Sequence, residues 1–273
     1  MSKPDRSTSD AVKAAAERLL RAEQDQKPTD PVRDLLGTTD VDLAYAVQAA
    51  VLERKLTALD RRVAGRKIGL TSAAVQKQFG VFRPDFGVLL DDMVFGDRVE
   101  LPLDTFLQPR VEGEVAFVLG TDLPAGSTLV DVLRATEFVL PAIEIVDSRI
   151  AGWDITITDT VADNASSGAV VLGTTPKKLT DVDLPALGMS LEHAGEPIST
   201  GVGAACLGAP ANAVAWLADE VARRGAPLRA GEVVLAGAWG PMITVDKPGG
   251  YVARFEDIGE VHVTFTGGKD GAR

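Results

Sequence analysis

Residues 109–119 read Pro-Arg-Val-Glu-Gly-Glu-Val-Ala-Phe-Val-Leu, an apolar run that carries glutamates at positions 112 and 114. Valine and phenylalanine over a run of this length are typical of a buried β-strand. Because successive side chains of a strand point to opposite faces, Glu112 and Glu114 share one face, and the face that begins with Val111 is apolar. The sequence therefore predicts a strand with a core face and, on its other face, two adjacent carboxylates.

A second segment, residues 140–147 (Leu-Pro-Ala-Ile-Glu-Ile-Val-Asp), places Glu144 between two isoleucines. Two carboxylates side by side on a strand repel each other and resist burial, so they require a cation or a proton. If Glu144 converges on Glu112 and Glu114, the three form an all-oxygen site with open positions, which suits Mg²⁺ or Mn²⁺. A polar sheet face with water on the carboxylates explains the same spacing, and the spacing alone leaves both interpretations open.

Two further polar residues lie among small and apolar neighbours. Lys67 lies in Gly-Arg-Lys-Ile-Gly-Leu at 65–70, where glycines allow the backbone to approach a ligand closely. A lysine beside a metal-bound anion could neutralise a carboxylate or transfer a proton. Asp85, between Pro84 and Phe86, is either a turn residue or an acid/base group. An exposed lysine at a strand end explains Lys67 equally well, so both residues stay open on the sequence alone.

Composition and charge exclude several classes of protein. The chain has 273 residues, 45% hydrophobic and 25% charged, which is the balance of a globular protein with a substantial core. A net charge of −11, with no stripe of lysine and arginine, argues against nucleic-acid binding. The single cysteine, Cys206, fits a reducing compartment. No stretch has 18 apolar residues and MSKPDRSTSD lacks a signal-peptide core, so we expect a cytoplasmic protein without a membrane segment.

The two histidines, His193 and His262, have no second histidine or cysteine at ligand spacing. This argues against a zinc site of the His/Cys type. A Ser-His-Asp or Cys-His arrangement would need one of these isolated residues as its base. We therefore expect the chemistry to depend on carboxylates, lysine or a hard metal ion.

The pattern along the chain predicts a helical N-terminal region, residues 1–62, followed by a catalytic β-rich domain, residues 63–273. Many short strands with few helices between them favour an α+β fold over a doubly wound sheet. Apolar residues at helical spacing predict helices at 10–26, 40–59, 72–79, 128–140 and 210–224, with Asp10, Asp40 and Thr128 as caps. Strands are expected at 63–70, 88–95, 98–101, 110–119, 140–147, 168–173, 187–193, 231–236, 242–246 and 260–266.

Four segments taken together resemble, in order, the 2-oxopent-4-enoate hydratases (2-hydroxypenta-2,4-dienoate hydratases) of bacterial meta-cleavage pathways, within the fumarylacetoacetate hydrolase superfamily. The segments are GRKIGLTSAAVQKQFGVFRPDFGVLLDDM, QPRVEGEVAFVL, LPAIEIVDSRIAGWDITITDTVADNASSG and LAGAWGPM. The resemblance runs from about residue 31 to the C-terminus. It implies a mixed β-roll of the fumarylacetoacetate hydrolase C-terminal type with an N-terminal helical region. It also implies a homo-oligomer, associated with a downstream aldolase or a related decarboxylase.

The resemblance further implies an Mg²⁺ or Mn²⁺ ion held by three acidic side chains, which map onto Glu112, Glu114 and Glu144. In the hydrolase branch of the superfamily the third ligand is usually aspartate, so Glu144 fits the hydratase and decarboxylase branch. The N-terminal region also lacks the histidine that a hydrolase would use in its lid.

Three more positions match motifs of the resembled family. Lys67 matches the lysine of G-x-K-I-G-L, and Asp85 matches the aspartate of P-D-[FY]-G. Ser166 lies in A-D-N-A-S, which lines the substrate pocket. Lys67 and Asp85 are therefore the candidate catalytic residues, and Ser166 is the candidate substrate-binding residue.

The implied activity is hydration of 2-hydroxypenta-2,4-dienoate to 4-hydroxy-2-oxopentanoate in aromatic or sterol catabolism. The dienol is protonated at C5 and water adds at C4, with the C1 carboxylate and the C2 oxygen on the metal. A 4-oxalocrotonate decarboxylase would use the same trio but would need a cation for its second carboxylate, and the sequence shows no clear candidate for it, with Arg149 and Arg83 left open. A non-catalytic subunit that stabilises a partner enzyme is the third alternative.

Overall fold

The computed structural model describes residues 6–72, 76, 81 and 83–267. Its N-terminal region holds helices α1 (Arg6–Gln24), α2 (Arg33–Leu36) and α3 (Val41–Ala58), which confirms the two predicted helices. The Asp40 side chain caps α3 by accepting a hydrogen bond from the Leu43 N–H at 2.9 Å. The first helix begins at Arg6, so the prediction that Asp10 caps it is wrong.

Two sheets form the rest of the structure. The eight-stranded sheet has the order β2-β1-β10-β5-β6-β7-β3, with β11 paired to β5, and the five-stranded sheet has the order β4-β13-β12-β8-β9. The pairs β1–β10, β3–β7 and β4–β13 are parallel and the other pairs are antiparallel. Mixed sheets with N-terminal helices confirm the predicted α+β class.

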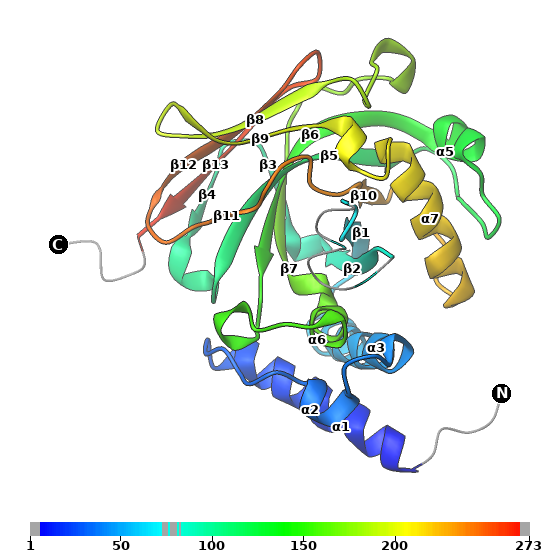
Figure 1. The fold of residues 1–273 in the computed structure, drawn as a ribbon, viewed down its shortest axis with the longest axis vertical. Helices are drawn as coiled ribbons and strands as arrows, with labels where there is room; N and C mark the ends of the chain where they lie inside the picture. The colour runs from blue at the N-terminus through cyan, green and yellow to red at the C-terminus, as the bar shows by residue number, and fades with distance from the viewer. Residues whose placement is uncertain (1–5, 73–75, 77–80, 82, 268–273) are drawn as a thin grey trace.

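The strands of the larger sheet are β1 (Val63–Gly69), β2 (Asp85–Leu90), β3 (Val94–Gly96), β5 (Pro109–Leu119), β6 (Thr136–Asp147), β7 (Ser167–Leu172), β10 (Val233–Leu235) and β11 (Ile243–Thr244). Those of the smaller sheet are β4 (Val99–Pro102), β8 (Gly188–His193), β9 (Glu196–Val202), β12 (Gly249–Phe255) and β13 (Gly259–Thr266). The remaining helices are α5 (Leu129–Ala135), α6 (Ile157–Ala162) and α7 (Pro210–Arg223). Figure 1 shows α1, α2, α3 and α6 gathered at one end of the molecule and α7 beside β10 and β1.

The two faces of β5 and β6 have different surroundings. Val111, Val115 and Phe117 are fully buried in the main core, which also contains residues of β12 and β13 from the smaller sheet. This confirms the predicted core face. The opposite face joins a second, smaller cluster that includes Leu89 of β2 and Val170 of β7. Because strands from both ends of the larger sheet contribute to this cluster, the sheet is rolled, and its inner face carries Glu112, Glu114 and Glu144.

Helix α3 packs against the strand that bears Asp85. The ring of Tyr45 stacks on Phe86 with centroids 4.6 Å apart, and its hydroxyl accepts a hydrogen bond from the Phe86 N–H. Gln48 donates to the carbonyls of Phe86 and Val161, which ties α3 to β2 and α6. The N-terminal helices therefore support the rolled sheet, and the boundary at residue 62 stays a prediction. Within the described ranges, no helix has both the length and the hydrophobicity that crossing a bilayer requires.

Some predicted elements differ from the structure. The prediction of a helix over 128–140 is wrong beyond Ala135, because Thr136–Leu140 begins β6 and pairs with the end of β5. The predicted strand 88–95 is divided by a 3₁₀ turn at Asp91–Met93. Strands β9 and β12 and helix α6 were not predicted from the sequence. The helix expected over 72–79 lies mostly outside the described residues.

Candidate active site

Three glutamates meet on the inner face of the rolled sheet. Glu112 on β5 lies directly opposite Glu144 on β6 in the antiparallel register, and Glu114 follows one position along the same face. One carboxylate oxygen from each lies within 4.8 Å of the other two. Glu114 and Glu144 are buried and Glu112 is half-buried. The structure thus brings the three predicted residues together, and their role as metal ligands stays a prediction.

The backbone of a neighbouring loop holds Glu114. Its Oε2 accepts a hydrogen bond of 2.8 Å from the Gly237 N–H. Gly237 has a φ of +106°, and a Cβ there would lie 2.2 Å from the Thr71 hydroxyl oxygen, so only glycine fits this position. Gly237 lies in the segment LAGAWGPM, in which the sequence predicted no role for it. A glycine between small residues after a strand was the available signal.

Lys67 provides a positive charge beside the cluster. Its Nζ lies 2.9 Å from Glu144 Oε1, and both side chains are almost fully buried. Burial opposes the charge on Lys67, but the surrounding carboxylates, Glu144 first, outweigh this effect and raise its pKa above the usual lysine value. Lys67 is therefore a buried cation, and the interpretation as an exposed strand-end lysine is wrong.

Asp85 is the first residue of β2 and pairs with Gly69 of β1. It is buried, and among the described residues its Oδ1 has no hydrogen-bond partner. A Cβ at Gly69 would lie 2.2 Å from that oxygen, so the second glycine of the lysine motif makes room for the aspartate. Burial raises the pKa of Asp85, while Lys67 acts in the opposite direction. The turn interpretation of Asp85 is therefore wrong.

The glutamates resist ionisation without a cation. Burial raises the pKa of Glu112 to about 7, the charge of Glu144 adds to the shift, and nearby cations oppose it. Burial and the two other glutamates raise the pKa of Glu114 well above its usual range. Lys67 is the lysine that neutralises this group of acids, and one lysine is too little for three glutamates and an aspartate. The cluster therefore favours an additional positive charge.

A divalent cation fits the donor atoms of this site. Glu114 Oε1 and Glu144 Oε2 are buried, and no partner within the described ranges donates a hydrogen bond to them. Buried carboxylate oxygens without donors are costly unless a cation or a proton occupies the space between them. Carboxylate oxygens from three side chains are the ligands that hard divalent ions prefer. Glu112, Glu114 and Glu144 are thus the residues that could hold such an ion.

Ser166 lies in a strained turn. Asn164, Ala165 and Ser166 all have positive φ, between +50° and +56°, which is uncommon for one non-glycine residue and rarer for three in succession. Ser166 is buried, and its hydroxyl has no hydrogen-bond partner in the described part of the chain. Strain of this kind concentrates at functional sites, where the surrounding structure maintains it. A free buried hydroxyl is consistent with the predicted substrate contact.

Asn164 holds this turn in place and was missed from the sequence. Its side chain pairs with the backbone of Val88 on β2, because Oδ1 accepts from the Val88 N–H and Nδ2 donates to the Val88 carbonyl, both at 2.8 Å. The available signal was an asparagine in a polar segment, since asparagine tolerates the left-handed region. The pair joins the strand of Asp85 to the turn of Ser166.

Comparison with known proteins identifies the family. The sequence model of the family described as Fumarylacetoacetate (FAA) hydrolase C-terminal matches residues 71–267. The chain belongs to the fumarylacetoacetate hydrolase family. A protein named TodF product hydratase, from Pseudomonas putida strain F1, is 53% identical over 266 residues, which cover 97% of this chain and 99% of that protein. A 2-keto-4-pentenoate hydratase from Paraburkholderia xenovorans strain LB400 is also 53% identical, over 93% of this chain and 91% of its own length.

A solved structure of the same family has the same fold. The 4-oxalocrotonate decarboxylase from Pseudomonas putida G7, complexed with magnesium and adipate, superposes with a TM-score of 0.90. It is 31% identical and covers 97% of this chain and all of that chain. These comparisons confirm the family and the fold that the quoted segments predicted.

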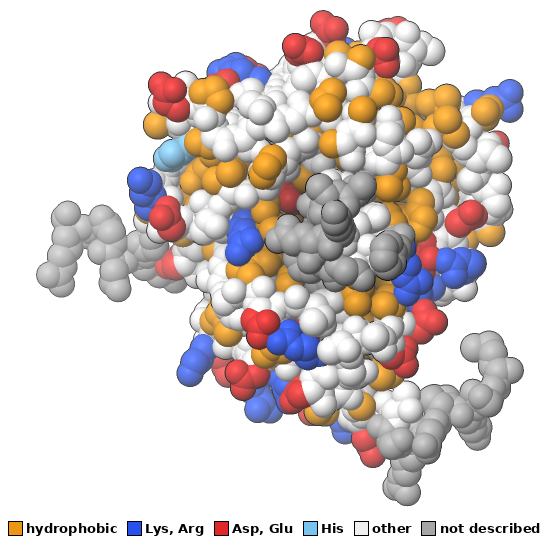
Figure 2. All heavy atoms as spheres, in the orientation of Figure 1, with side chains coloured by type: hydrophobic (Ala, Val, Ile, Leu, Met, Phe, Trp, Pro, Cys, Tyr) orange, Lys and Arg blue, Asp and Glu red, His pale blue; other side chains and the backbone are white. Residues whose placement is uncertain are grey.

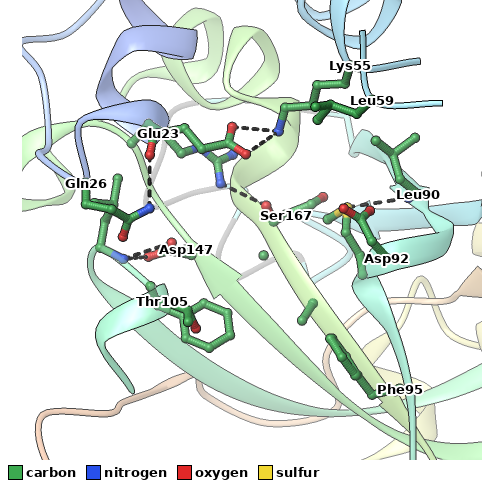
Figure 3. Close-up of a pocket in the computed structure, with 16 residues that line it drawn as sticks. Glu23, Gln26, Lys55, Leu59, Leu90, Asp92, Phe95, Thr105, Asp147 and Ser167 are labelled. Carbon is green, nitrogen blue, oxygen red and sulfur yellow. Dashed lines mark hydrogen bonds and ion pairs between the residues drawn. The ribbon is translucent and has the colours of Figure 1, made fainter. Parts of the chain in front are cut away.

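Of the two arginines considered for a second carboxylate, Arg149 is not available for one. Arg149 is buried, and its guanidinium binds Asp163 through Nε–Oδ1 at 2.5 Å and donates to the Ser167 carbonyl. Arg83 is exposed. Arg149 lines a cavity of about 310 Å³ outside the acidic cluster, where Glu23 pairs with Lys55 (Figure 3). Arg149 therefore stabilises the connection between β6 and β7 through its bonds to Asp163 and Ser167.

Proposed function

We propose that this enzyme is a hydro-lyase that adds water to 2-hydroxypenta-2,4-dienoate and forms 4-hydroxy-2-oxopentanoate, in aromatic or sterol meta-cleavage catabolism. The observation that carries the proposal is the buried trio of Glu112, Glu114 and Glu144 with Lys67, on a chain 53% identical to a 2-keto-4-pentenoate hydratase over most of both lengths. Members of this family catalyse several different reactions. The sequence identity to hydratases therefore favours hydration.

The three glutamates would hold a divalent cation, which we propose to be Mg²⁺ or Mn²⁺. Their all-oxygen donor set and the unpartnered oxygens of Glu114 and Glu144 support this assignment. When bound, the cation supplies Lewis-acid stabilisation of negative charge on the C2 oxygen of the substrate. The decarboxylase structure of the same fold contains magnesium, which agrees with a hard divalent ion.

The residues around the trio have distinct proposed roles. Lys67 stays protonated between Glu144 and Asp85, so it acts as a fixed cation that orients Glu144 and attracts the substrate carboxylate. Asp85 has a free buried oxygen and is the candidate for transferring a proton or orienting water. Ser166 offers its free hydroxyl to a polar substrate atom.

The reaction balances without a redox partner. A proton is added at C5 of the dienol as the C2 hydroxyl loses its proton, which leaves a C3–C4 double bond conjugated to the C2 ketone. Water then adds at C4, its hydroxyl forming the new C–O bond and its second proton going to C3. Asp85 is suited to accept and return these protons, because burial keeps it able to exist in the neutral form.

The rival reaction is decarboxylation of 4-oxalocrotonate, supported by the fold of the solved decarboxylase. Lower identity, 31% against 53%, and the internal bonding of Arg149 favour the hydratase. Side-by-side assays of both substrates, with Mg²⁺, with Mn²⁺ and with a chelator, test the choice. We expect metal-dependent hydration of the pentadienoate; preferential release of CO₂ from 4-oxalocrotonate would overturn the proposal.

A non-catalytic partner subunit predicts a different outcome: no turnover and no metal binding by the purified protein. The presence of all three glutamates and Lys67 argues against it. The homo-oligomeric state, the association with an aldolase or decarboxylase and the cytoplasmic location stay predictions. Figure 2 shows acidic and basic side chains interspersed on one face of the molecule.

A further inference from the structure

Arg110 lies on the same face of β5 as the glutamates. It precedes Glu112 by two residues, about 6.8 Å along a strand, and it pairs with Val146 of β6 and Thr244 of β11. The side chains on this face therefore follow in the order Arg110, Glu112, Glu114, and the arginine lies at the end of the row.

The guanidinium of Arg110 lacks the partner that half-buried arginines normally have. Its Nε is buried and has no hydrogen-bond partner among the described residues, and Nη1 makes a weak contact of 3.7 Å to the sulfur of Met242. In the described ranges, no carboxylate lies within ion-pair distance of it. Most other arginines of this acidic chain with buried or half-buried side chains have such a partner. Arg110 is thus a cation with free donors.

A tryptophan fixes the position of that cation. The Arg110 guanidinium carbon lies 4.1 Å from the centre of the Trp153 ring, which is the geometry of a cation–π contact. Trp153 has a φ of +57° and donates its indole N–H to the Gln108 carbonyl at 3.1 Å. The strained backbone and the hydrogen bond hold the ring over the guanidinium. Arg110 and Trp153 both line a cavity of about 710 Å³ at this end of β5.

The acidic character of the site indicates a role for Arg110 in binding an anion. The candidate site combines three glutamates with one ion-paired lysine, so acidic side chains outnumber basic ones there. A substrate carboxylate entering such a site is repelled unless another positive charge is near. A guanidinium binds a carboxylate through two parallel N–H donors, which suits the free side of Arg110.

We propose that Arg110 is a substrate-binding residue that contacts the C1 carboxylate of the incoming 2-oxo acid, and that Trp153 is its positioning residue. The inference rests on the proposed function, since it assumes that a 2-oxo acid binds at the glutamate trio. It adds an anion-binding side chain to the candidate site.

The test measures the affinity of the Arg110→Gln protein for pyruvate and its affinity for Mn²⁺. We expect the two to respond differently to the substitution. Pyruvate has the carboxylate and 2-oxo group of the substrate without the diene, so its binding to Mn²⁺-loaded protein is measured by calorimetry. We expect pyruvate affinity to fall about 10- to 100-fold, because a charged donor is lost. Affinity for Mn²⁺ alone should stay the same or increase, because a positive charge near three carboxylates has been removed. A merely structural role would weaken both.

Three further proteins complete the test. Arg110→Lys should recover part of the pyruvate affinity, and Arg229→Gln, which alters an exposed arginine paired with Asp122, should behave like the unaltered enzyme. If Arg110→Gln does not fold, Trp153→Leu replaces it, since this change keeps the charge but removes the ring; weaker pyruvate binding with intact Mn²⁺ binding supports the proposal.

The proposal is overturned if Arg110→Gln binds pyruvate within about twofold of the unaltered enzyme, or if Mn²⁺ and pyruvate affinities fall together. Loss of adipate binding with unchanged pyruvate binding also overturns it, since the contact would then be to a distal carboxylate. Failure of the hydratase proposal gives a different result. If the protein binds Mn²⁺ and pyruvate but does not hydrate the dienoate, the proposed reaction is wrong. The pyruvate titrations then still decide the role of Arg110.

Discussion

Glu144 connects the glutamate trio to Lys67. It faces Glu112 across the β5–β6 pair, and one of its oxygens lies 2.9 Å from Lys67. Its second oxygen is buried and has no donor in the described ranges. Removing the charge of Glu144 therefore changes the cation site and the environment of Lys67 together, whereas its size and its place on β6 are kept by glutamine.

Glu144→Gln should lower the affinity for Mn²⁺ at least about 100-fold and reduce hydration in parallel, since a direct ligand contributes more than the residues that support it. The matched control is Glu137→Gln, which changes an exposed glutamate on the same strand. Mn²⁺ titration and initial rates measure both proteins. If Glu144→Gln kept the affinity and metal dependence of the unaltered enzyme, the glutamate trio would not be the metal site.

Proton release should accompany metal binding. Without a cation, burial raises the pKa of Glu112 to about 7, so this carboxyl is mostly protonated at pH 6, and burial also raises the pKa of Glu114 well above its usual range. A metal ion must displace these protons, so Mn²⁺ affinity should rise as the pH increases from 6 to 8. Calorimetry in buffers of different ionisation enthalpy counts the protons released, and Glu112→Gln should release fewer. Equal affinity at pH 6 and pH 8 would contradict the assignment.

At the scale of elements, the turn at 164–166 depends on one side chain from a neighbouring strand. The paired hydrogen bonds between Asn164 and Val88 hold three residues in the left-handed region. The carbonyl of Asn164 also accepts a bond from the Ser167 hydroxyl. The Cβ of any residue at Gly87 would lie 2.3 Å from that carbonyl oxygen, so β2 and the turn are in direct backbone contact.

Asn164→Ala should lower the free energy of unfolding by about 1–3 kcal/mol, since the backbone N–H and carbonyl of Val88 lose their partners. It should also raise KM for the dienoate, because Ser166 loses its support. Asn212→Ala is the control: its side chain donates to the Leu207 carbonyl at an exposed position, and a change within about 0.5 kcal/mol is expected. Denaturant unfolding and initial rates measure the difference. Equal stability of the two variants would show that the turn does not need Asn164.

The close contact between β1 and β10 leads to a second prediction about the strands. A Cβ at Gly65 would lie 2.0 Å from the Val233 carbonyl oxygen, and these two residues pair in the parallel register. Gly65→Ala should therefore destabilise the protein by about 3 kcal/mol or prevent folding. Gly96→Ala, where nothing lies within 4 Å of the added Cβ, should change the stability by less than about 0.5 kcal/mol. Similar unfolding midpoints for both variants would contradict the proposed close approach.

Strands and site residues differ in how far the sequence predicts them. Alternation predicts β5 well because one face of that strand is buried against the second sheet and the other carries charge. The segment Thr136–Leu140 was misassigned because Glu137 and its neighbours also fit helical spacing, and pairing with β5 decides for the strand. Asn164 and Gly237 could not be assigned roles, since their function depends on contacts with distant backbone atoms.

At the scale of the whole molecule, the fold places acidic groups where water cannot solvate them. The rolled sheet encloses one face of β5 and β6, the second sheet covers the other face, and the N-terminal helices close one end (Figure 1). Each cover reduces the access of water to Glu114, Glu144 and Asp85. The shielding strengthens electrostatic interactions with a substrate. We therefore expect a cation bound at the glutamate trio to stabilise the fold.

Metal binding should therefore stabilise the whole protein, and more strongly at higher pH. The folded-state pKa of Glu112 is raised from 4.5 to about 7, so without a cation its contribution to stability is lost as the pH rises through that window. Mn²⁺ at about 100 times its dissociation constant adds about 2.7 kcal/mol. For a chain of this size that corresponds to a rise in Tm of roughly 5–10 °C.

Thermal unfolding with Mn²⁺ and with a chelator, at pH 6 and pH 8, measures this coupling. At a fixed Mn²⁺ concentration the rise in Tm should be larger at pH 8, because fewer protons compete for the carboxylates. Glu144→Gln should show little rise at either pH, while Glu137→Gln should respond like the unaltered protein. A rise of the same size in Glu144→Gln would mean that Mn²⁺ stabilises the fold from another position, since the buried trio would then have no part in the effect.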